Sequence, residues 1–297
     1  MTKKRSLIQN IIVSMRPKQW TKNLFIFATL LFSKNLFNLS LLLTTILAFV
    51  IFCLLSGGVY LINDIVDLER DKNHPRKTKR PLAAGQLGIS SSIIAAVLLI
   101  LISLTVSFLI NLYFGLVALS YFLLMTAYTL VLKEIVIIDV LTISFGFVLR
   151  VVAGALIIAV EVSPWLLICT ILLALFLALA KRRHELILLE DAASVHRRIL
   201  REYTSKLLDE MMAVVTASTL MAYILYTISS RTIEELHTKN LIFTTPFVIY
   251  GIFRYLYLIH QKGLGGNPED ILLKDKPLIV NIFLWILTVI IILYLAP

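Results

Sequence analysis

Apolar stretches long enough to cross a bilayer recur along the whole chain, and they constrain its fold more than any other feature. A helix needs about 20 predominantly apolar residues to span the hydrocarbon core. About nine such stretches are present, which predicts an all-α, polytopic membrane protein. They lie at about 20–36, 41–62, 90–110, 112–131, 136–158, 163–181, 208–229, 241–260 and 277–295.

The composition excludes a soluble protein. Of the 297 residues, 59% are hydrophobic and only 15% are charged, and the mean hydropathy is +0.91. A soluble domain needs far more polar surface, so residues 1–297 are expected to form a single transmembrane domain. Cys53 and Cys169 lie in apolar stretches, which indicates buried small side chains and no disulfide framework. The basic N-terminus lacks a small-residue cleavage site, so no removable signal peptide is expected.

Two polar interruptions decide the exact number of spans. Lys34 and Asn35 break the end of the first stretch. Only Asn111 separates the third stretch from the fourth. We interpret both places as boundaries between separate helices.

Basic residues alternate between connections in a way that orients the chain. The net charge is +10, and most lysines and arginines lie in the N-terminal segment and at about 63–89, 181–207 and 261–276. The positive-inside rule places these segments in the cytoplasm. The N-terminus is therefore expected in the cytoplasm and the C-terminus outside, as an odd number of spans requires. The protein is thus predicted to be a multi-pass protein of the inner (plasma) membrane, with its polar chemistry on the cytoplasmic side.

A dense run of acids follows the second apolar stretch. If the preceding helix continues, Asn63, Asp67 and Asp71 fall at i, i+4 and i+8, and Asp64 lies beside Asp67. This spacing places their oxygens on one face. Mg²⁺ prefers hard oxygen ligands and is often shared between a few carboxylates and the phosphates of a substrate. The run therefore predicts a Mg²⁺ site that receives a phosphorylated substrate.

A basic run comes directly after the acids and suits phosphate. Lys79 and Arg80 precede a compact turn at 81–85, which is placed to hold them over the site. The alternative is a solvated loop whose mixed charges only anchor the membrane interface. We favour the metal site because carboxylates near hydrocarbon are costly and a solvated loop does not need regularly spaced acids.

A second charged constellation ends the sixth apolar stretch. Lys181 and Glu185 are spaced i, i+4, and Arg182 and Glu185 are spaced i, i+3. One interpretation is a cationic clamp for phosphate, with Glu185 as a further carboxylate for metal or ribose hydroxyls. The alternative is a positive-inside anchor held by ordinary helix ion pairs. Anchoring alone explains Arg183, Arg197 and Arg198 equally well.

Further polar residues lie in or near the spans. Asp139 and Arg150 interrupt an apolar stretch just after Lys133-Glu134, where unpaired charge is unfavourable, so they either pair with another helix or line a cavity. The segment at 263–270 is glycine-rich and is either a loop that closes over a substrate or a plain turn. The five histidines share no ligand spacing, which argues against a zinc site.

The motif Asn-Asp-x-x-Asp-x-x-x-Asp at the cytoplasmic end of the second span resembles the first signature of the UbiA superfamily of intramembrane prenyltransferases. Further segments resemble its decaprenyl-phosphate (polyprenyl-phosphate) phosphoribosyltransferase branch. One departure separates the branches. Prenyltransferases that use a diphosphate and an aromatic acceptor are expected to carry a second motif, Asp-x-x-x-Asp, after the sixth span, whereas this chain has Lys181-Arg182-Arg183-His184-Glu185 there. The segments that resemble the phosphoribosyl branch are 16–23, 63–85, 146–150, 181–186, 196–204 and 265–269.

The resemblance implies a helical bundle around a central cavity that opens to the cytoplasm and laterally to lipid. It implies Mg²⁺-dependent transfer of 5-phosphoribose from phosphoribosyl diphosphate to a polyprenyl phosphate, with release of diphosphate, in cell-envelope biosynthesis. Asp64, Asp67 and Asp71 are the expected catalytic, metal-binding residues. The lipid phosphate is already anionic, so it needs positioning more than a general base. The expected substrate-binding residues are Asn63, Lys79, Arg80, Lys181, Arg182, Glu185, Lys18, Lys22 and Arg150.

Two other functions remain open at this stage. One is an aromatic or quinone prenyltransferase that uses a polyprenyl diphosphate and has an altered second site. The other is a membrane transporter or lipid-binding protein without chemistry, although transporters place their polar residues near the bilayer midplane rather than at one face. The expected partners are the membrane, phosphoribosyl diphosphate and a polyprenyl phosphate. No nucleic-acid partner is expected, and homo-oligomerisation is left open.

Overall fold

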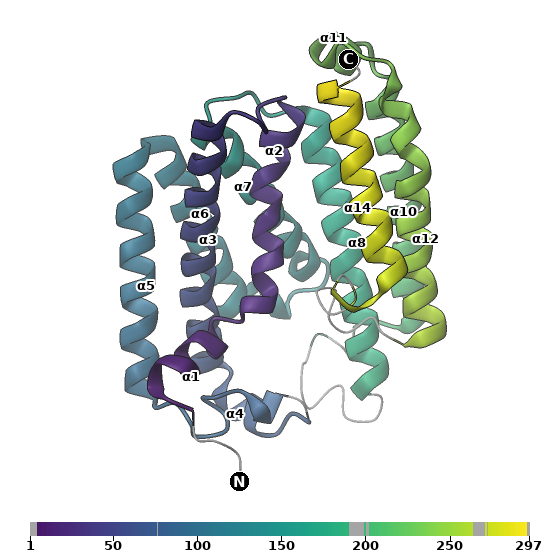
Figure 1. Ribbon diagram of the computed structural model, residues 1–297. Coiled ribbons are helices and arrows are strands. Elements are labelled where there is room, and N and C mark those ends of the chain that lie inside the picture. The colour runs from purple at the N-terminus through teal and green to yellow at the C-terminus, as the bar shows by residue number, and fades with distance from the viewer. Residues whose placement is uncertain are drawn as a thin grey trace.

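The computed structural model describes residues 5–75, 77–189, 199, 202–263, 271 and 273–295. Within these ranges every regular element is a helix, as the sequence predicts (Figure 1). Eight helices in this part of the chain are long and apolar enough to cross a membrane. They are α3 (Leu39–Val66), α5 (Ile89–Ile110), α6 (Leu112–Leu130), α7 (Ile138–Ile157), α8 (Pro164–Leu189), α10 (Ser205–Ile228), α12 (Thr245–Lys262) with the preceding η6 (Asn240–Thr244), and α14 (Lys276–Ile290) with the following η7 (Ile291–Leu295).

The first predicted span is a composite rather than one regular helix. A 3₁₀ segment, η1 (Pro17–Ile26), continues directly into α2 (Phe27–Phe32). A 3₁₀ helix rises about 2.0 Å per residue and an α-helix about 1.5 Å, so together they extend roughly 29 Å. Figure 1 shows this purple segment running beside α3 and α7. The first predicted span is thus this composite of a 10-residue 3₁₀ helix and a 6-residue α-helix, and it is not among the eight helices of the described chain that are long and apolar enough to cross a membrane.

The contact between η1 and α7 depends on a glycine. A Cβ atom on Gly154 would lie 2.1 Å from the carbonyl oxygen of Ile26, so no larger residue fits there without moving the backbone. α7 also packs between α6 and α8. In its most apolar part 56% of α7 is buried, against 22% for α5, so α7 is a central helix and α5 a peripheral one.

Polar caps set the ends of several spans. Asn111, the predicted boundary residue, accepts hydrogen bonds from the backbone N–H groups of Tyr113 (2.8 Å) and Phe114 (3.1 Å). It therefore ends α5 and starts α6, as expected from an N-cap side chain. Asn38, Thr204 and Asp275 cap α3, α10 and α14 in the same way.

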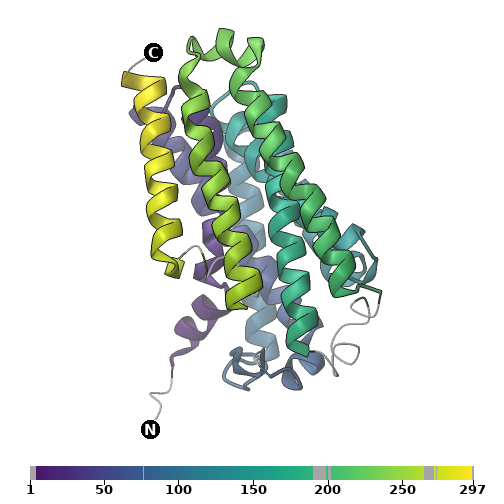
Figure 2. The same ribbon diagram turned by 90° about the vertical axis from the view of Figure 1, so that its right-hand side faces the viewer.

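The two ends of the bundle differ in chemistry. The N-terminal residues lie at one end together with α1 (Leu7–Ser14), α4 (Leu68–Lys72) and η2 (Lys77–Lys79), and the C-terminus lies at the other end (Figures 1 and 2). Opposite ends fit eight spanning helices together with the composite of η1 and α2. The acid run, Lys79 and Arg80 and the charged residues that end α8 lie at the N-terminal end, which we refer to as the polar end, whereas Arg150 lies deeper in α7.

Candidate functional site

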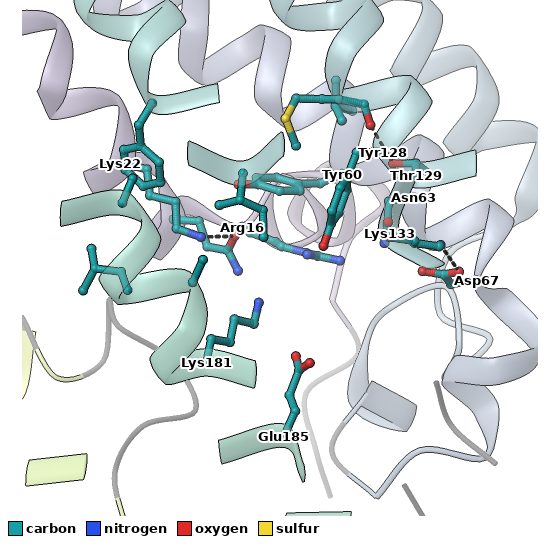
Figure 3. Close-up of a pocket in the computed structure, with 18 of the residues that line it drawn as sticks. Arg16, Lys22, Tyr60, Asn63, Asp67, Tyr128, Thr129, Lys133, Lys181 and Glu185 are labelled. Atoms are coloured by element: carbon teal, nitrogen blue, oxygen red, sulfur yellow. Dashed lines mark hydrogen bonds and ion pairs between the residues drawn. The ribbon is translucent and has the colours of Figure 1, made fainter. Parts of the chain in front are cut away.

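A cavity of about 230 Å³ opens among the helices at the polar end. The lining residues on α3, α6, α7 and α8 recur at helical spacing, so one face of each of these four helices points into the cavity. Figure 3 shows the charged ones reaching into the same space from different helices. The lining includes Val59, Tyr60, Asn63 and Asp67 on α3, Tyr121, Met125, Tyr128 and Thr129 on α6, Ile143, Phe147 and Arg150 on α7, and Ala174, Leu177, Ala178, Lys181 and Glu185 on α8.

The acid run does not form one uninterrupted helix. α3 ends at Val66, and Asp67 lies at the junction with the short helix α4. The backbone nevertheless keeps helical hydrogen bonds across the junction, because Asp67 N–H donates to the Asn63 carbonyl (3.0 Å) and Asp71 N–H donates to the Asp67 carbonyl (2.8 Å). The predicted shared face therefore survives with a local break. Asn63, Asp67 and Asp71 line the cavity, whereas Asp64 is buried behind them.

Two arginines cross-link two of the acids, and we call Arg16, Asp64, Asp71 and Arg80 the arginine–carboxylate cluster. Arg80 pairs with Asp64 (3.1 Å, Nη1 to Oδ1) and with Asp71, and Arg16 pairs with Asp64. Arg16 also lies over the ring of Tyr60, 4.7 Å from its centroid. Both arginine side chains keep about a fifth of their surface exposed, at 20% and 23%. The cluster is therefore charge-balanced and in contact with the cavity.

Burial shifts the protonation equilibria in this cluster. It raises the pKa of Asp71, while Arg80 and Lys77, whose Nζ lies 3.9 Å from Asp71 Oδ1, act in the opposite direction. Burial, followed by the neighbouring Arg16 charge, lowers the pKa of Arg80. Each charge is thus held in place by its partners rather than by water.

Asp67 has a different partner. Lys133, in the short 3₁₀ helix η3 (Leu132–Glu134), contacts it at 2.6 Å (Nζ to Oδ1), as Figure 3 shows. The Lys133 side chain is only 7% exposed. A lysine that the sequence associates with Glu134 and Asp139 is therefore brought to the acid run by the fold.

The oxygen donors of this region suit a hard divalent cation, since Asn63, Asp67 and Asp71 line one cavity. In the described part of the chain, no three side chains of the metal-binding type already form a group around one point. Asp64 and Asp71 share Arg80, and Asp67 is bound by Lys133. The assignment of Asp64, Asp67 and Asp71 as metal ligands stays a prediction, and it requires these cations to exchange partners.

Within the second constellation, Arg182 is sealed inside the protein, whereas Lys181 and Glu185 reach the cavity. Arg182 is 1% exposed and donates to Asp139 (2.5 Å, from Nε), to Glu185 and to the Tyr128 hydroxyl (2.8 Å). Tyr203 donates its hydroxyl proton to Asp139 (2.9 Å), and burial raises the pKa of Tyr203 to about 12. We call these five residues the Arg182 cluster. It joins α6, α7 and α8 to the segment that precedes α10.

The structure separates the predicted cationic residues by location. Lys181, Arg80, Lys22 and Arg150 line the cavity, and so does Glu185. Arg182 lies outside this lining, because its side chain is buried and its guanidinium binds Asp139 and Glu185. Lys18 and Lys79 are exposed and also lie outside the lining. The predicted contributions of Arg197, Arg198 and the glycine-rich loop fall on residues outside the described part of the chain.

Arg150 is buried, at 4% exposure, deep in the cavity wall. It donates to the side chain of Asn23 (2.7 Å), to the Gly146 carbonyl (2.7 Å) and to the Tyr121 hydroxyl (2.8 Å). All three acceptors are neutral, and no carboxylate among the described residues pairs with it. A buried positive charge without a counter-ion favours an anionic ligand.

Several lining residues were not found from the sequence. Tyr60, Tyr128 and Thr129 all line the cavity, and Figure 3 shows them facing the charged groups. Tyr60 is three residues before Asn63 and seven before Asp67, so helical spacing from the acid run is the signal that points to it. Tyr128 and Thr129 carry no comparable signal, because nothing in their own helix marks its inward face.

Two named phosphoribosyltransferases resemble this chain over nearly its whole length. Residues 24–267 match the model of the UbiA prenyltransferase family. The chain is 32% identical to a decaprenyl-phosphate phosphoribosyltransferase of Corynebacterium glutamicum, covering 99% of this chain and 89% of that protein. It is 32% identical to the enzyme of the same name from Mycolicibacterium smegmatis, covering 96% and 92%. A solved UbiA homolog from Archaeoglobus fulgidus, bound to GPP and Mg²⁺, superposes with a TM-score of 0.72 at 18% identity, covering 96% and 99% of the two chains.

Proposed function

The chain belongs to the UbiA prenyltransferase family, and on that premise we propose that it transfers 5-phosphoribose from phosphoribosyl diphosphate to a polyprenyl phosphate, releasing diphosphate. The similarity to named phosphoribosyltransferases supports this reaction. One observation carries it further: the wall opposite Asp67 and Asp71 presents Lys181 and Glu185 from α8 instead of a second group of aspartates. A single carboxylate group facing cations suits one diphosphate on metal and a separate lipid phosphate on basic side chains.

The cavity has two chemically different zones, and we assign one substrate to each. Its polar end carries the carboxylates, Lys133 and Lys181, which suits the soluble, highly charged donor. Its deeper wall includes Phe25, Met125 and Phe147, which suits a polyprenyl chain. Arg150 lies in the deeper zone and Lys22 lies on η1, and both are assigned to anionic groups of the bound substrates.

The reaction forms one bond and breaks another at the anomeric carbon of the ribose. An oxygen of the lipid phosphate attacks this carbon, and the bond to diphosphate breaks, through a centre with oxocarbenium character. The attacking phosphate is already anionic, so the residues around it need to position it rather than remove a proton. Lys181 and Lys22 are assigned to hold the two phosphorylated groups at attacking distance.

Mg²⁺, when bound, would neutralise charge that develops on the leaving diphosphate. Asp67 and Asp71 are the residues we assign to hold it, with Asp64 behind them and Asn63 donating to a ribose or phosphate oxygen. Binding of the metal and the donor then requires the basic side chains that now pair with these carboxylates to move to the substrate. Lys133 and Arg80 leave the carboxylates for phosphate oxygens as the donor enters, so no buried charge is left unpaired.

The position of the site agrees with the proposed topology. The cavity and the N-terminus share the polar end of the bundle (Figure 1). We assign this end to the cytoplasmic side of the inner membrane, because the basic connections lie there and the soluble donor is available there.

A direct assay separates this function from its rivals. Purified protein in detergent is given Mg²⁺ with labelled phosphoribosyl diphosphate and polyprenyl phosphate, or with an allylic diphosphate and an aromatic acid. We expect a labelled phosphoribosyl lipid and an equal amount of released diphosphate in the first reaction only. Product in the second reaction alone would establish an aromatic prenyltransferase, and product in neither would contradict an enzymatic function.

A further inference from the structure

The short helix α1 turns polar side chains toward the protein and apolar side chains outward, which is the reverse of a helix on a water-exposed surface. Its buried residues include Asn10 and Ser14, both polar. Its exposed residues include Ile8 (69%), Ile12 (45%) and Val13 (39%). A helix on a soluble surface turns its apolar side toward the protein. The outer face of α1 therefore requires an apolar surrounding.

The depth of α1 in the bundle indicates what that surrounding is. Ile11 packs against a cluster that includes Leu61 of α3 and Ala96 of α5. On the next turn, Met15 packs on the backbone of Gly57, where an added Cβ would meet it at 3.0 Å. These residues of α3 and α5 lie inside membrane-spanning helices, not in the loops beyond them.

The neighbouring surface at this depth is also apolar. Ile93 (47% exposed) and Val97 (48% exposed) flank Ala96 on α5 and turn outward. As side chains of a peripheral spanning helix, they face lipid. The outer face of α1 is thus continuous with a lipid-facing surface.

Charge at the ends of α1 complements a negatively charged membrane. The first 22 residues contain six basic residues and no acidic one. Arg5 precedes the helix and Lys18 follows it, and both are exposed. Basic residues beside an apolar helix face bind the interface of a leaflet that contains anionic lipid.

We propose that α1 lies in the bilayer interface, with Ile8, Ile12 and Val13 in the boundary between headgroups and acyl chains of an anionic leaflet. Its partner is thus the membrane itself. This location of α1 in the membrane interface also helps to position one residue of the cavity wall. Arg16, which binds Asp64, follows α1 directly.

The connection between α1 and Arg16 is rigid. Arg16 has a φ of 55°, a left-handed conformation that non-glycine residues adopt only when their surroundings hold them there. Two contacts hold the flanking backbone: Asn10 donates to the Gln86 carbonyl (2.9 Å), and Trp20 donates to the Met15 carbonyl (3.2 Å). The binding of α1 to the membrane therefore supports the position of the Arg16 guanidinium.

Spin labels test the location of α1 without reference to any activity. Ile8→Cys and Ile12→Cys are labelled in vesicles of phosphatidylcholine and phosphatidylglycerol, and the label on Asn73→Cys, an exposed residue after α4, is the aqueous control. The unmutated protein, with Cys53 and Cys169, gives the background. We expect oxygen to relax the labels at 8 and 12 more than a water-soluble nickel chelate does, and the reverse at 73.

Three outcomes would overturn the proposal. Labels at 8 and 12 that behave like the label at 73 would place α1 in water. Labels shielded from both relaxing agents would show that a protein covers this face. If the labels at 8 and 12 differ from the label at 73 just as much in vesicles of pure phosphatidylcholine, the role of anionic lipid would be contradicted.

A second arm tests the link to the site, and it alone rests on the proposed function. The double variant Ile8→Glu/Ile12→Glu is expected to lower phosphoribosyl transfer in vesicles by roughly tenfold, with a smaller loss for Gln9→Glu, which keeps the helix cap. If the labels report lipid and the double variant keeps full activity, the link to Arg16 is wrong. If the unmutated protein shows no transfer at all, the proposed function fails while the location of α1 still stands on the first arm.

Discussion

The arginine–carboxylate cluster and the Arg182 cluster contain the same kinds of residues at the same end of the bundle, yet they differ in what a ligand can reach. Arg16 and Arg80 keep about a fifth of their side-chain surface exposed, whereas Arg182 is 1% exposed and Asp139 is 0% exposed. Glu185, at 20% exposure, is the charge of the second cluster that reaches the cavity. Charges at the edge of a cavity can exchange partners with a ligand. Sealed charges cannot do so without exposing an unpaired ion in the interior. The comparison therefore assigns substrate binding to the first cluster and helix joining to the buried Arg182–Asp139 pair of the second.

The largest expected effect comes from breaking the sealed cluster. Arg182→Met leaves the buried Asp139 without the cation it pairs with, and removal of one partner of a buried pair typically costs about 3–5 kcal/mol of stability. We expect a large fall in the denaturation temperature of the purified protein. Arg183→Met is the matched control, because its partner Asp209 is 37% exposed. If Arg182→Met is as stable as Arg183→Met but binds phosphoribosyl diphosphate more weakly than the unmutated protein does, Arg182 binds phosphate rather than joining helices.

The open cluster is expected to respond in rate rather than stability. Asp67→Asn keeps an oxygen beside Lys133 but removes the charge assigned to the metal. Loss of a charge that acts in the transition state lowers the rate by about 10²–10³. Initial rates of phosphoribosyl transfer and the denaturation temperature are measured together. Glu69→Gln is the control, since this side chain is 81% exposed and pairs with Lys72 on the surface. Rates close to normal in Asp67→Asn would remove Asp67 from the site.

Lys181 lies next to Arg182 in sequence but belongs to the open region, so it sharpens the comparison residue by residue. A hydrogen bond to a charged group contributes about 1.5–3 kcal/mol, and we expect Lys181→Met to weaken the binding of one phosphorylated substrate by roughly ten- to a hundredfold. Lys206→Met, at 87% exposure, is the control. If the affinities for both substrates match those of the control, Lys181 serves only as a membrane anchor.

The smallest expected effect is a shift in pH dependence. Burial raises the pKa of Asp71, and Lys77 counteracts this rise. Asp71 must lose its proton to bind metal, so the rate should fall on acidification at a higher pH than for an ordinary aspartate. Lys77→Met removes a charge that lowers this pKa, so the acidic limb should move to higher pH. An unchanged limb in the variant would show that a different group controls it.

Local features of the sequence predicted the spans and the acid run. Hydropathy is a property of consecutive residues, and Asn111 caps its own helix, so both appear without knowledge of the fold. The composite of η1 and α2 was less accessible, because its close approach to α7 brings together Ile26 and Gly154, which are far apart in the chain.

The sorting of charges into open and sealed clusters was not accessible from the sequence. Arg182 pairs with Asp139, which is 43 positions away, and Asp67 pairs with Lys133, which is 66 positions away. Spacing within a helix identified Lys181, Arg182 and Glu185 as one group, but it did not show that adjacent residues point to different surroundings. Helix rotation and packing decide that, and both are tertiary properties.

Equilibrium binding of phosphoribosyl diphosphate to the purified protein tests the central claim most directly, because it needs neither the lipid nor turnover. It is measured with Mg²⁺ and with a chelator, in the unmutated protein, in Asp67→Asn and in the control Glu69→Gln. If the carboxylates beside Arg80 and Lys133 receive the donor through Mg²⁺, the unmutated protein and the control bind only with the metal, and Asp67→Asn binds at least tenfold more weakly, about 1.4 kcal/mol. Equal affinity with and without the metal, or between Asp67→Asn and the unmutated protein, would contradict the account.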